Sequence, residues 1–152
     1  MKITPSKINW FLLAKLPSAY FTGVRLKSLD DNKAMTTVKH RWINQNPFKS
    51  MYFAVQCMAS ELSTGILVIK KIHDSGKKVS MLVTEQKSTF TKKARGRIYF
   101  TCSDGHKIDA ALEETLKTGE GQILELTSIG VDEKGDEVSS FTYQWSIKLK
   151  EK

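Results

Sequence analysis

The stretch NPFKSMYFAVQCMASELSTG, residues 46–65, decides the fold of this chain. Its apolar part carries a single acidic side chain, Glu61, and a helix that is apolar on nearly all sides belongs in the centre of a fold. Two lysines follow the apolar run, and Gly76 then offers a stop for the helix. The stretch therefore predicts a long central helix over residues 50–72.

Glu61 is the unusual residue in this helix. An unpaired carboxylate buried among apolar groups costs several kcal/mol, on the order of 2–7 for a polar group alone. The side chain must therefore lie at an edge, have a polar partner, or perform chemistry. Asn46, just before the helix, is a second polar candidate, although an Asn before a Pro is also an ordinary turn or capping residue.

The segments around the central helix alternate between helical and strand patterns. Residues 4–17, within an N-terminal helical segment 1–20, predict a short amphipathic helix with Ser6 as its cap and Pro17 as its stop. A second, surface helix is predicted over residues 105–119. Period-two patterns predict strands as pairs within residues 23–42, 79–103 and 121–150.

Six strands joined as hairpins imply an antiparallel sheet, and a helix that is apolar all round must be enclosed by it. The sequence therefore predicts an α+β fold in which a bent antiparallel sheet of about six strands wraps a long central helix. No linker or repeat interrupts residues 1–152, so one domain is expected.

Composition excludes some classes of protein and leaves others open. The net charge of +8 would attract nucleic acid, an anionic membrane surface or a phosphate-rich ligand, and many small proteins carry such a charge without a specific partner. Nucleic acid is disfavoured because no nucleic-acid motif is present and the aromatic residues follow core-like patterns. The apolar runs are too short to span a bilayer, and the patch at residues 10–14 is too short for a secretory signal. A cytoplasmic protein is expected.

The thiols and imidazoles show no metal-binding pattern. Cys57 and Cys102 are far apart and lie in apolar segments, which favours free core thiols over a disulfide. No histidine stands at helical spacing to activate Cys57 as a nucleophile, and the three histidines show no ligand spacing. We expect neither a metal nor a cofactor.

The order of elements resembles the hotdog fold, and the chain resembles the thioesterase-like hotdog proteins of bacteria related to the phenylacetyl-CoA thioesterases. The resemblance covers most of residues 5–149. It is concentrated in KLPSAYFTGVRL, WINQNPFKSMYFAVQCMASELSTG and VDEKGDEVSSFTYQWSIKL. It implies an edge-to-edge homodimer or homotetramer that binds an acyl thioester of coenzyme A or of a carrier protein.

The resemblance also implies site residues. The branch has an Asn before the central helix, a His-Gly-Gly tripeptide where the helix begins, and an acid about two turns further on. Asn46 matches the Asn and Glu61 matches the acid, whereas Tyr52, Phe53 and Ala54 stand where His-Gly-Gly would be. The histidine and both glycines are thus absent.

These residue types fit thioester hydrolysis. A carboxylate with a raised pKa, here Glu61, can activate water or attack the thioester directly. Backbone amides of Phe53 or Ala54 at the helix start can stabilise the negative charge on the carbonyl oxygen, and Asn46 can orient water. Tyr52 and Thr64 are further substrate-binding candidates, Thr64 because it shares the helix face of Glu61.

The loop TKKARGR, residues 91–97, gathers four basic residues: Lys92, Lys93, Arg95 and Arg97. Such a cluster can hold the phosphates of coenzyme A, which would be part of the substrate, or can simply be a solvated basic loop. Two functions therefore remain open. The first is a thioesterase that uses Glu61, and the second is a non-catalytic acyl-ligand or interaction module in which Tyr52 and Phe53 close the oxyanion site.

Overall fold

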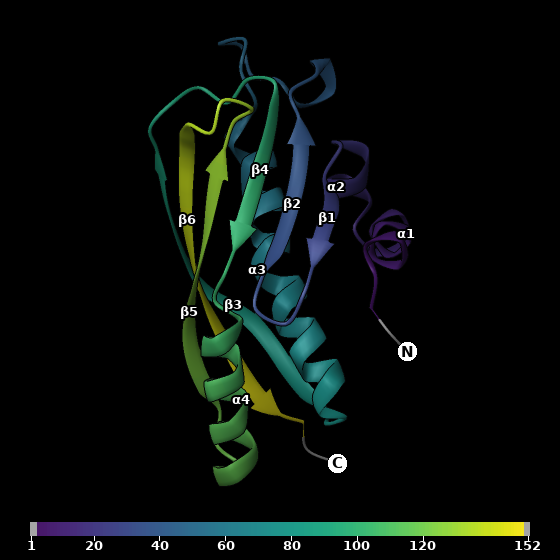
Figure 1. Ribbon diagram of the computed structural model, residues 1–152, viewed down its shortest axis with the longest axis vertical. Helices are drawn as coiled ribbons and strands as arrows, with labels where there is room; N and C mark the ends of the chain where they lie inside the picture. The colour runs from purple at the N-terminus through teal and green to yellow at the C-terminus, as the bar shows by residue number, and fades with distance from the viewer. Residues whose placement is uncertain (1–2, 151–152) are drawn as a thin grey trace.

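A computed structural model describes residues 3–150 of the chain (Figure 1). Its helices and strands, in chain order, are α1 (Pro5–Lys15), α2 (Pro17–Phe21), β1 (Arg25–Leu29), β2 (Ala34–Lys39), a 3-10 turn η1 (Trp42–Asn44), α3 (Phe53–Ser75), β3 (Val79–Phe90), β4 (Arg97–Cys102), α4 (Gly105–Thr118), β5 (Gln122–Val131) and β6 (Glu137–Leu149).

In this part of the chain one six-stranded antiparallel sheet, with the order β1-β2-β4-β5-β6-β3, packs around α3. Figure 1 shows α3 behind β2 and β4, α1 and α2 beside the β1 edge, and α4 at the far end next to β5. The predicted α+β architecture, a curved sheet around a long helix, is confirmed.

One predicted strand pairing is wrong. β3 and β4 follow one another in sequence and were expected to form a hairpin, but β3 pairs with β6, whereas β4 lies between β2 and β5. Local alternation fixes which residues of a strand face the core, whereas the choice of partner strand depends on long-range packing. β3 is therefore an edge strand of twelve residues.

Two helices begin elsewhere than predicted. α3 starts at Phe53 and ends at Ser75, three residues later at each end than the predicted 50–72, because Ser50 and Met51 make loop and bridge contacts instead. The N-terminal segment is divided into α1 and α2. Thr4, not Ser6, caps α1 by accepting from the Lys7 amide, and Pro17 begins α2 as well as ending α1. Residues 1–2 of the predicted segment lie outside the described residues.

The composition of α3 also meets the length and hydropathy of a membrane span. Counting uninterrupted apolar runs in the sequence missed this, because Ser, Thr and Gly shorten the runs while lowering the average hydropathy only slightly. In the fold, 61% of the most apolar 18-residue window is buried, as expected for a core helix that packs against the sheet and α4.

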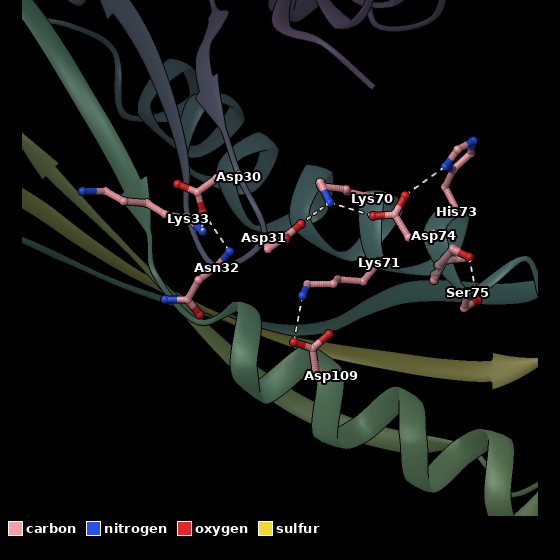
Figure 2. A network of polar contacts seen from close by, with 11 residues as sticks. Asp30, Asp31, Asn32, Lys33, Lys70, Lys71, His73, Asp74, Ser75 and Asp109 are labelled. Atoms are coloured by element: carbon pink, nitrogen blue, oxygen red, sulfur yellow. Dashed lines mark hydrogen bonds and ion pairs between the residues drawn. The ribbon is translucent and has the colours of Figure 1, made fainter. Parts of the chain in front are cut away.

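The last turns of α3 are tied to two neighbouring elements by ion pairs (Figure 2). Lys70 lies between Asp31 in the β1–β2 turn and Asp74, at 2.5 and 2.6 Å, and Lys71 pairs with Asp109 of α4 at 2.7 Å. The lysine side chains are 16% and 12% exposed, but their aspartate partners are largely open to solvent, so each pair contributes little to stability on its own. They fix the end of α3 that is remote from Asn46.

The loop before α3 is held by Asn44, which is 2% exposed. Its side chain donates to the carbonyl oxygens of Thr22 and Lys39, each at 2.9 Å, and accepts from the Arg41 amide at 2.8 Å. We expect Asn44→Ala to lower the free energy of unfolding by about 3 kcal/mol, because buried polar groups lose their partners. Urea unfolding would measure this, with the exposed Gln45→Ala as control; equal stability of the two variants would contradict it.

Candidate functional site

Four polar side chains form a stripe along α3 that faces the sheet: Gln56, Ser60, Ser63 and Thr64. All four are buried, and each forms a hydrogen bond with a side chain of β5 or β6. The pairs are Gln56 with Ser139 (2.7 Å), Ser60 with Tyr143 (2.6 Å), Ser63 with Ser128 (2.7 Å) and Thr64 with Trp145 (3.1 Å). Because buried hydroxyl and indole groups need partners, these four pairs fix the rotation of the helix about its axis. That rotation turns Glu61 away from the buried stripe.

Glu61 is partly buried and lines a cavity of about 280 Å³ between α3 and the α1–α2 junction. The other lining residues are Lys15, Leu16, Pro17, Ser18, Ala19, Met58 and Leu62. Its carboxylate has no hydrogen bond or ion pair within residues 3–150. Burial among apolar groups raises the pKa of this carboxyl above its ordinary value of 4.5.

The raised pKa makes stability depend on pH in a defined direction. The unfolded chain ionises Glu61 near its ordinary pKa of 4.5, while the folded protein keeps the proton to higher pH. The native state thus loses stability as the pH rises through that interval. We expect Glu61→Gln to become increasingly more stable than the parent protein in urea unfolding as the pH rises above 4.5. A pH-independent difference would contradict this, and exposed Glu113→Gln serves as the control.

Asn46 holds its own loop together. Its Oδ1 accepts from the backbone amides of Phe48 (3.0 Å) and Ser50 (3.2 Å) and from the Ser50 hydroxyl (3.2 Å). Its Nδ2 donates to the Met51 carbonyl at 3.4 Å. These bonds account for the side chain as a turn residue, and they leave one amide hydrogen for a ligand.

The start of α3 opens onto a cavity of about 710 Å³. Tyr52 and Phe53 line it and are 49% and 54% exposed, and Asn46 lies on its wall. Tyr52 is the N-cap residue but makes no side-chain bond to the helix, so the amides of Phe53 and Ala54 have no acceptor among the described residues. Free amides at a helix start favour a negatively charged or carbonyl oxygen.

Thr64 does not face either cavity. It is fully buried, accepts from the Trp145 indole N–H, and donates to the Glu61 carbonyl oxygen at 2.9 Å. The structure therefore gives it a supporting position between helix and sheet, not the substrate-contacting position expected from its spacing to Glu61. A shared helix face in the sequence did not reveal that β6 covers Thr64.

The basic loop between β3 and β4 is divided among different contacts. Lys92 forms ion pairs with Asp132 and Asp136, both at 2.7 Å. Arg95 donates to the Lys49 carbonyl oxygen, and Arg97 to the Thr37 hydroxyl, at 3.2 and 3.3 Å. Lys92 and Lys93 line the 710 Å³ cavity with Asn46, Tyr52 and Phe53, whereas Arg95 lines a neighbouring hollow together with both lysines.

Glu61 and the free amides do not meet within one chain. Glu61 lies eight positions after Phe53 in α3, which is about 12 Å along the helix axis. A reacting carbonyl must lie about 3 Å from both its base and its oxyanion donors. The two sets of groups line different cavities, so they cannot act on the same carbonyl group within one chain.

Sequence reasoning missed the walls around Glu61. The α1–α2 junction forms one wall through Leu16 and Pro17, and Trp145 of β6 approaches Gly65 at the same point as Glu61 Oε1. A usable signal for Trp145 existed, since a buried indole requires an acceptor and Thr64 belongs to the polar stripe. No local signal places residues 15–19 next to Glu61.

The same fold occurs in solved structures that share little sequence with this chain. PA5026 of Pseudomonas aeruginosa, described as a protein of unknown function and probable thioesterase, superposes with a TM-score of 0.81 at 19% identity over 97% of both chains. OLEI01261 of Chlorobaculum tepidum, of unknown function, gives 0.81 at 17% identity over 97% of this chain and 98% of that one. The thioesterase HI1161 of Haemophilus influenzae gives 0.76 at 9% identity over 98% and 93%. At these identities the likeness establishes the hotdog fold.

The chain belongs to the DUF4442 family, a domain of unknown function, whose model matches residues 6–147. The family and the fold of its solved neighbours confirm the thioesterase-like hotdog resemblance that was drawn from the sequence. A comparison with curated protein sequences finds no match.

Proposed function

We propose that this protein hydrolyses an acyl thioester of coenzyme A or of an acyl-carrier protein, with Glu61 as the reacting carboxylate. The observation that carries the proposal is the state of Glu61, an unpaired acid in an apolar setting on the wall of a cavity. A carboxyl with a raised pKa is a better base at neutral pH than an ordinary one. The thioesterase descriptions of PA5026 and HI1161 support the same reaction class.

The reaction balances with groups of this chain. The Glu61 carboxylate removes a proton from water, and the hydroxide adds to the thioester carbonyl to give a tetrahedral oxyanion. The oxyanion collapses, the carbon–sulfur bond breaks, and the Glu61 carboxylic acid returns its proton to the leaving thiolate. In the alternative course the carboxylate attacks the carbonyl carbon directly, the carbon–sulfur bond breaks, and the thiolate leaves an anhydride behind. Water then hydrolyses the anhydride to the acid product and the Glu61 carboxylate, and the proton released passes to the thiolate.

The oxyanion needs hydrogen-bond donors, for which the free amides of Phe53 and Ala54 are suited. Since these amides lie about 12 Å from Glu61 of the same helix, the complete site needs two copies of the chain. Two copies with antiparallel α3 helices would bring Glu61 of each beside the helix start of the other. The long edge strand β3 offers a surface for such pairing. A homodimer or a homotetramer built from it is therefore part of the proposal.

The coenzyme would contribute the only non-protein group, as part of the substrate. Lys93 and Arg95 have no ion pair within residues 3–150 and flank the cavity at the start of α3. They are suited to the phosphates of coenzyme A by charge-assisted hydrogen bonds.

A second candidate is a non-catalytic module that binds acyl thioesters or a protein partner. Two observations favour it. Tyr52 and Phe53 place aromatic rings where small residues would leave the amides open, and the Asn46 side chain is largely occupied by its own loop. In this case ligand would bind without turnover.

A screen separates the two candidates. Release of free thiol from short, long and aromatic acyl-CoAs would be followed with the parent protein, and direct binding of the same ligands by calorimetry. Turnover of at least one class supports the hydrolase. Binding without turnover of any class supports the module, and light scattering of the same samples reports the number of copies.

A further inference from the structure

Gly65 lies one turn after Glu61 in the middle of α3, where glycine destabilises a helix relative to alanine. A Cβ atom placed on Gly65 would lie 3.1 Å from Glu61 Oε1 and 3.2 and 3.3 Å from two ring atoms of Trp145. The carboxylate and the indole thus approach the same point above the helix backbone. The missing side chain is what allows both to lie there.

Trp145 is held firmly in this position. It is 4% exposed and lies on β6 between Val83 of β3 and Leu124 of β5. Its indole N–H donates to Thr64 Oγ1 at 3.1 Å, and Thr64 Oγ1 donates to the carbonyl oxygen of Glu61 at 2.9 Å. The ring is therefore connected through Thr64 to the turn of helix that carries the carboxylate, and it approaches the same point above Gly65 as Glu61 Oε1.

We infer that Trp145 is the positioning residue of Glu61. Its indole ring is held by the hydrogen bond to Thr64, and it has room there because Gly65 lacks a side chain. The ring forms an apolar wall that orients the Glu61 carboxyl group and keeps water from one side of it. An indole face removes solvent without supplying a charge or a strong acceptor. The inference concerns the environment of Glu61, and its importance for turnover rests on the proposed function.

Few other groups can set the ionisation of Glu61. Lys15 faces the same cavity from α1 but is exposed and forms no ion pair in the described part of the chain. Tyr143 of β6 is the other titratable neighbour, and burial raises its pKa, so its hydroxyl stays neutral. On α3 itself Cys57 lies one turn before Glu61 and contacts the Tyr143 hydroxyl. Burial away from water is therefore the main influence on the ionisation of Glu61, and it raises the pKa of this carboxyl.

The first test uses fluorescence and needs no catalytic activity. The chain contains three tryptophans, of which Trp10 and Trp42 are 72% and 83% exposed. In the double variant Trp10→Phe, Trp42→Phe the emission comes from Trp145 alone. We expect this emission to change with pH along a single titration above 4.5, and to lose that titration when Glu61→Gln is added. Emission that does not titrate, or that titrates in the same way after the Glu61→Gln substitution, overturns the inference.

The second test removes the wall. Trp145→Phe takes away the ring atoms that approach Gly65, so water reaches the carboxyl and the pKa of Glu61 should fall toward 4.5, as followed by ¹³C NMR of the carboxyl carbon. Phe100→Leu is the matched control, since Phe100 is fully buried in the same sheet but is not among the atoms nearest Gly65. It should leave that titration unchanged.

The outcomes distinguish this inference from the proposed function. An unchanged Glu61 titration in folded Trp145→Phe overturns the inference even if the protein hydrolyses thioesters. If Trp145→Phe does not fold, the fluorescence titration of the parent ring decides the question. A protein that shows the coupled titration but no turnover keeps the inference and loses the hydrolase.

Discussion

Replacing Glu61 with glutamine is expected to lower kcat for acyl-CoA hydrolysis by about 10²–10⁴-fold, because an amide can neither accept a proton from water nor attack the thioester. KM should change little, since glutamine has nearly the shape of glutamate and Glu61 forms no ion pair with Lys15, the other charged residue of the cavity wall, in the described part of the chain. The assay is release of free thiol under saturating substrate. If the parent protein hydrolyses thioesters as proposed, its kcat should rise with pH above 4.5, because the base must be ionised and its pKa is raised.

The control for this prediction is Glu113→Gln on the exposed side of α4, which removes the same charge far from both cavities. It should retain full turnover. Because Glu61→Gln also removes a partly buried charge without a partner, the variant should remain folded and at least as stable at neutral pH. Unchanged turnover in a folded Glu61→Gln protein would refute the role of this residue.

Gly105→Ala is expected to produce the largest loss of stability from a single methyl group. Gly105 begins α4 against the β1–β2 turn, and its amide donates to the Asn32 carbonyl at 3.0 Å. A Cβ there would lie 2.5 Å from both Asn32 Cα and the Asp31 carbonyl oxygen, which are backbone atoms that cannot turn away. We expect a loss of about 3 kcal/mol in urea unfolding, at the upper end of overpacking effects.

Gly119→Ala at the other end of α4 is the matched control. A Cβ at Gly119 would meet no atom within 4 Å, but its φ of +78° disfavours an L side chain, so a loss of about 1 kcal/mol is expected. A Gly105→Ala protein no less stable than Gly119→Ala would show that the turn moves away from α4. The shift would also be visible in the ion pair between Asp31 and Lys70.

The sequence predicted the positions of the helices and strands better than it predicted which strands pair with one another. The period-two pattern predicted within residues 121–150 agrees with the burial of Phe141, Tyr143, Trp145 and Ile147 of β6, and Gly135 adopts a positive φ in the turn before this strand. The predicted β3–β4 hairpin failed because the partner of a strand depends on contacts far away in the sequence. The start of α3 was predicted three residues too early, because the apolar part of the sequence begins before the first residue of the helix, Phe53.

The candidate site was only partly predictable for a similar reason. A lone acid in an apolar helix identified Glu61, since composition alone makes such a residue costly. Composition could not separate the side of the helix that meets the sheet from the side that meets a cavity, so Thr64 was placed with Glu61. The spacing of Asn46 from Glu61 fits the catalytic pattern of the resembled family. In the structure, however, the Asn46 side-chain oxygen already accepts hydrogen bonds from the backbone of its own loop.

The pairing of Lys92 with Asp132 and Asp136 affects how ligand binding to this protein would respond to salt. These ion pairs connect the β3–β4 loop to the β5–β6 hairpin at the protein surface, where rising salt weakens ion pairs and largely screens charges more than about 10 Å apart at 0.1 M. Added salt would therefore loosen the loop as well as weaken its attraction for phosphate. The slope of affinity against ionic strength would overstate the number of phosphates bound, unless Lys92→Met were measured beside the parent chain.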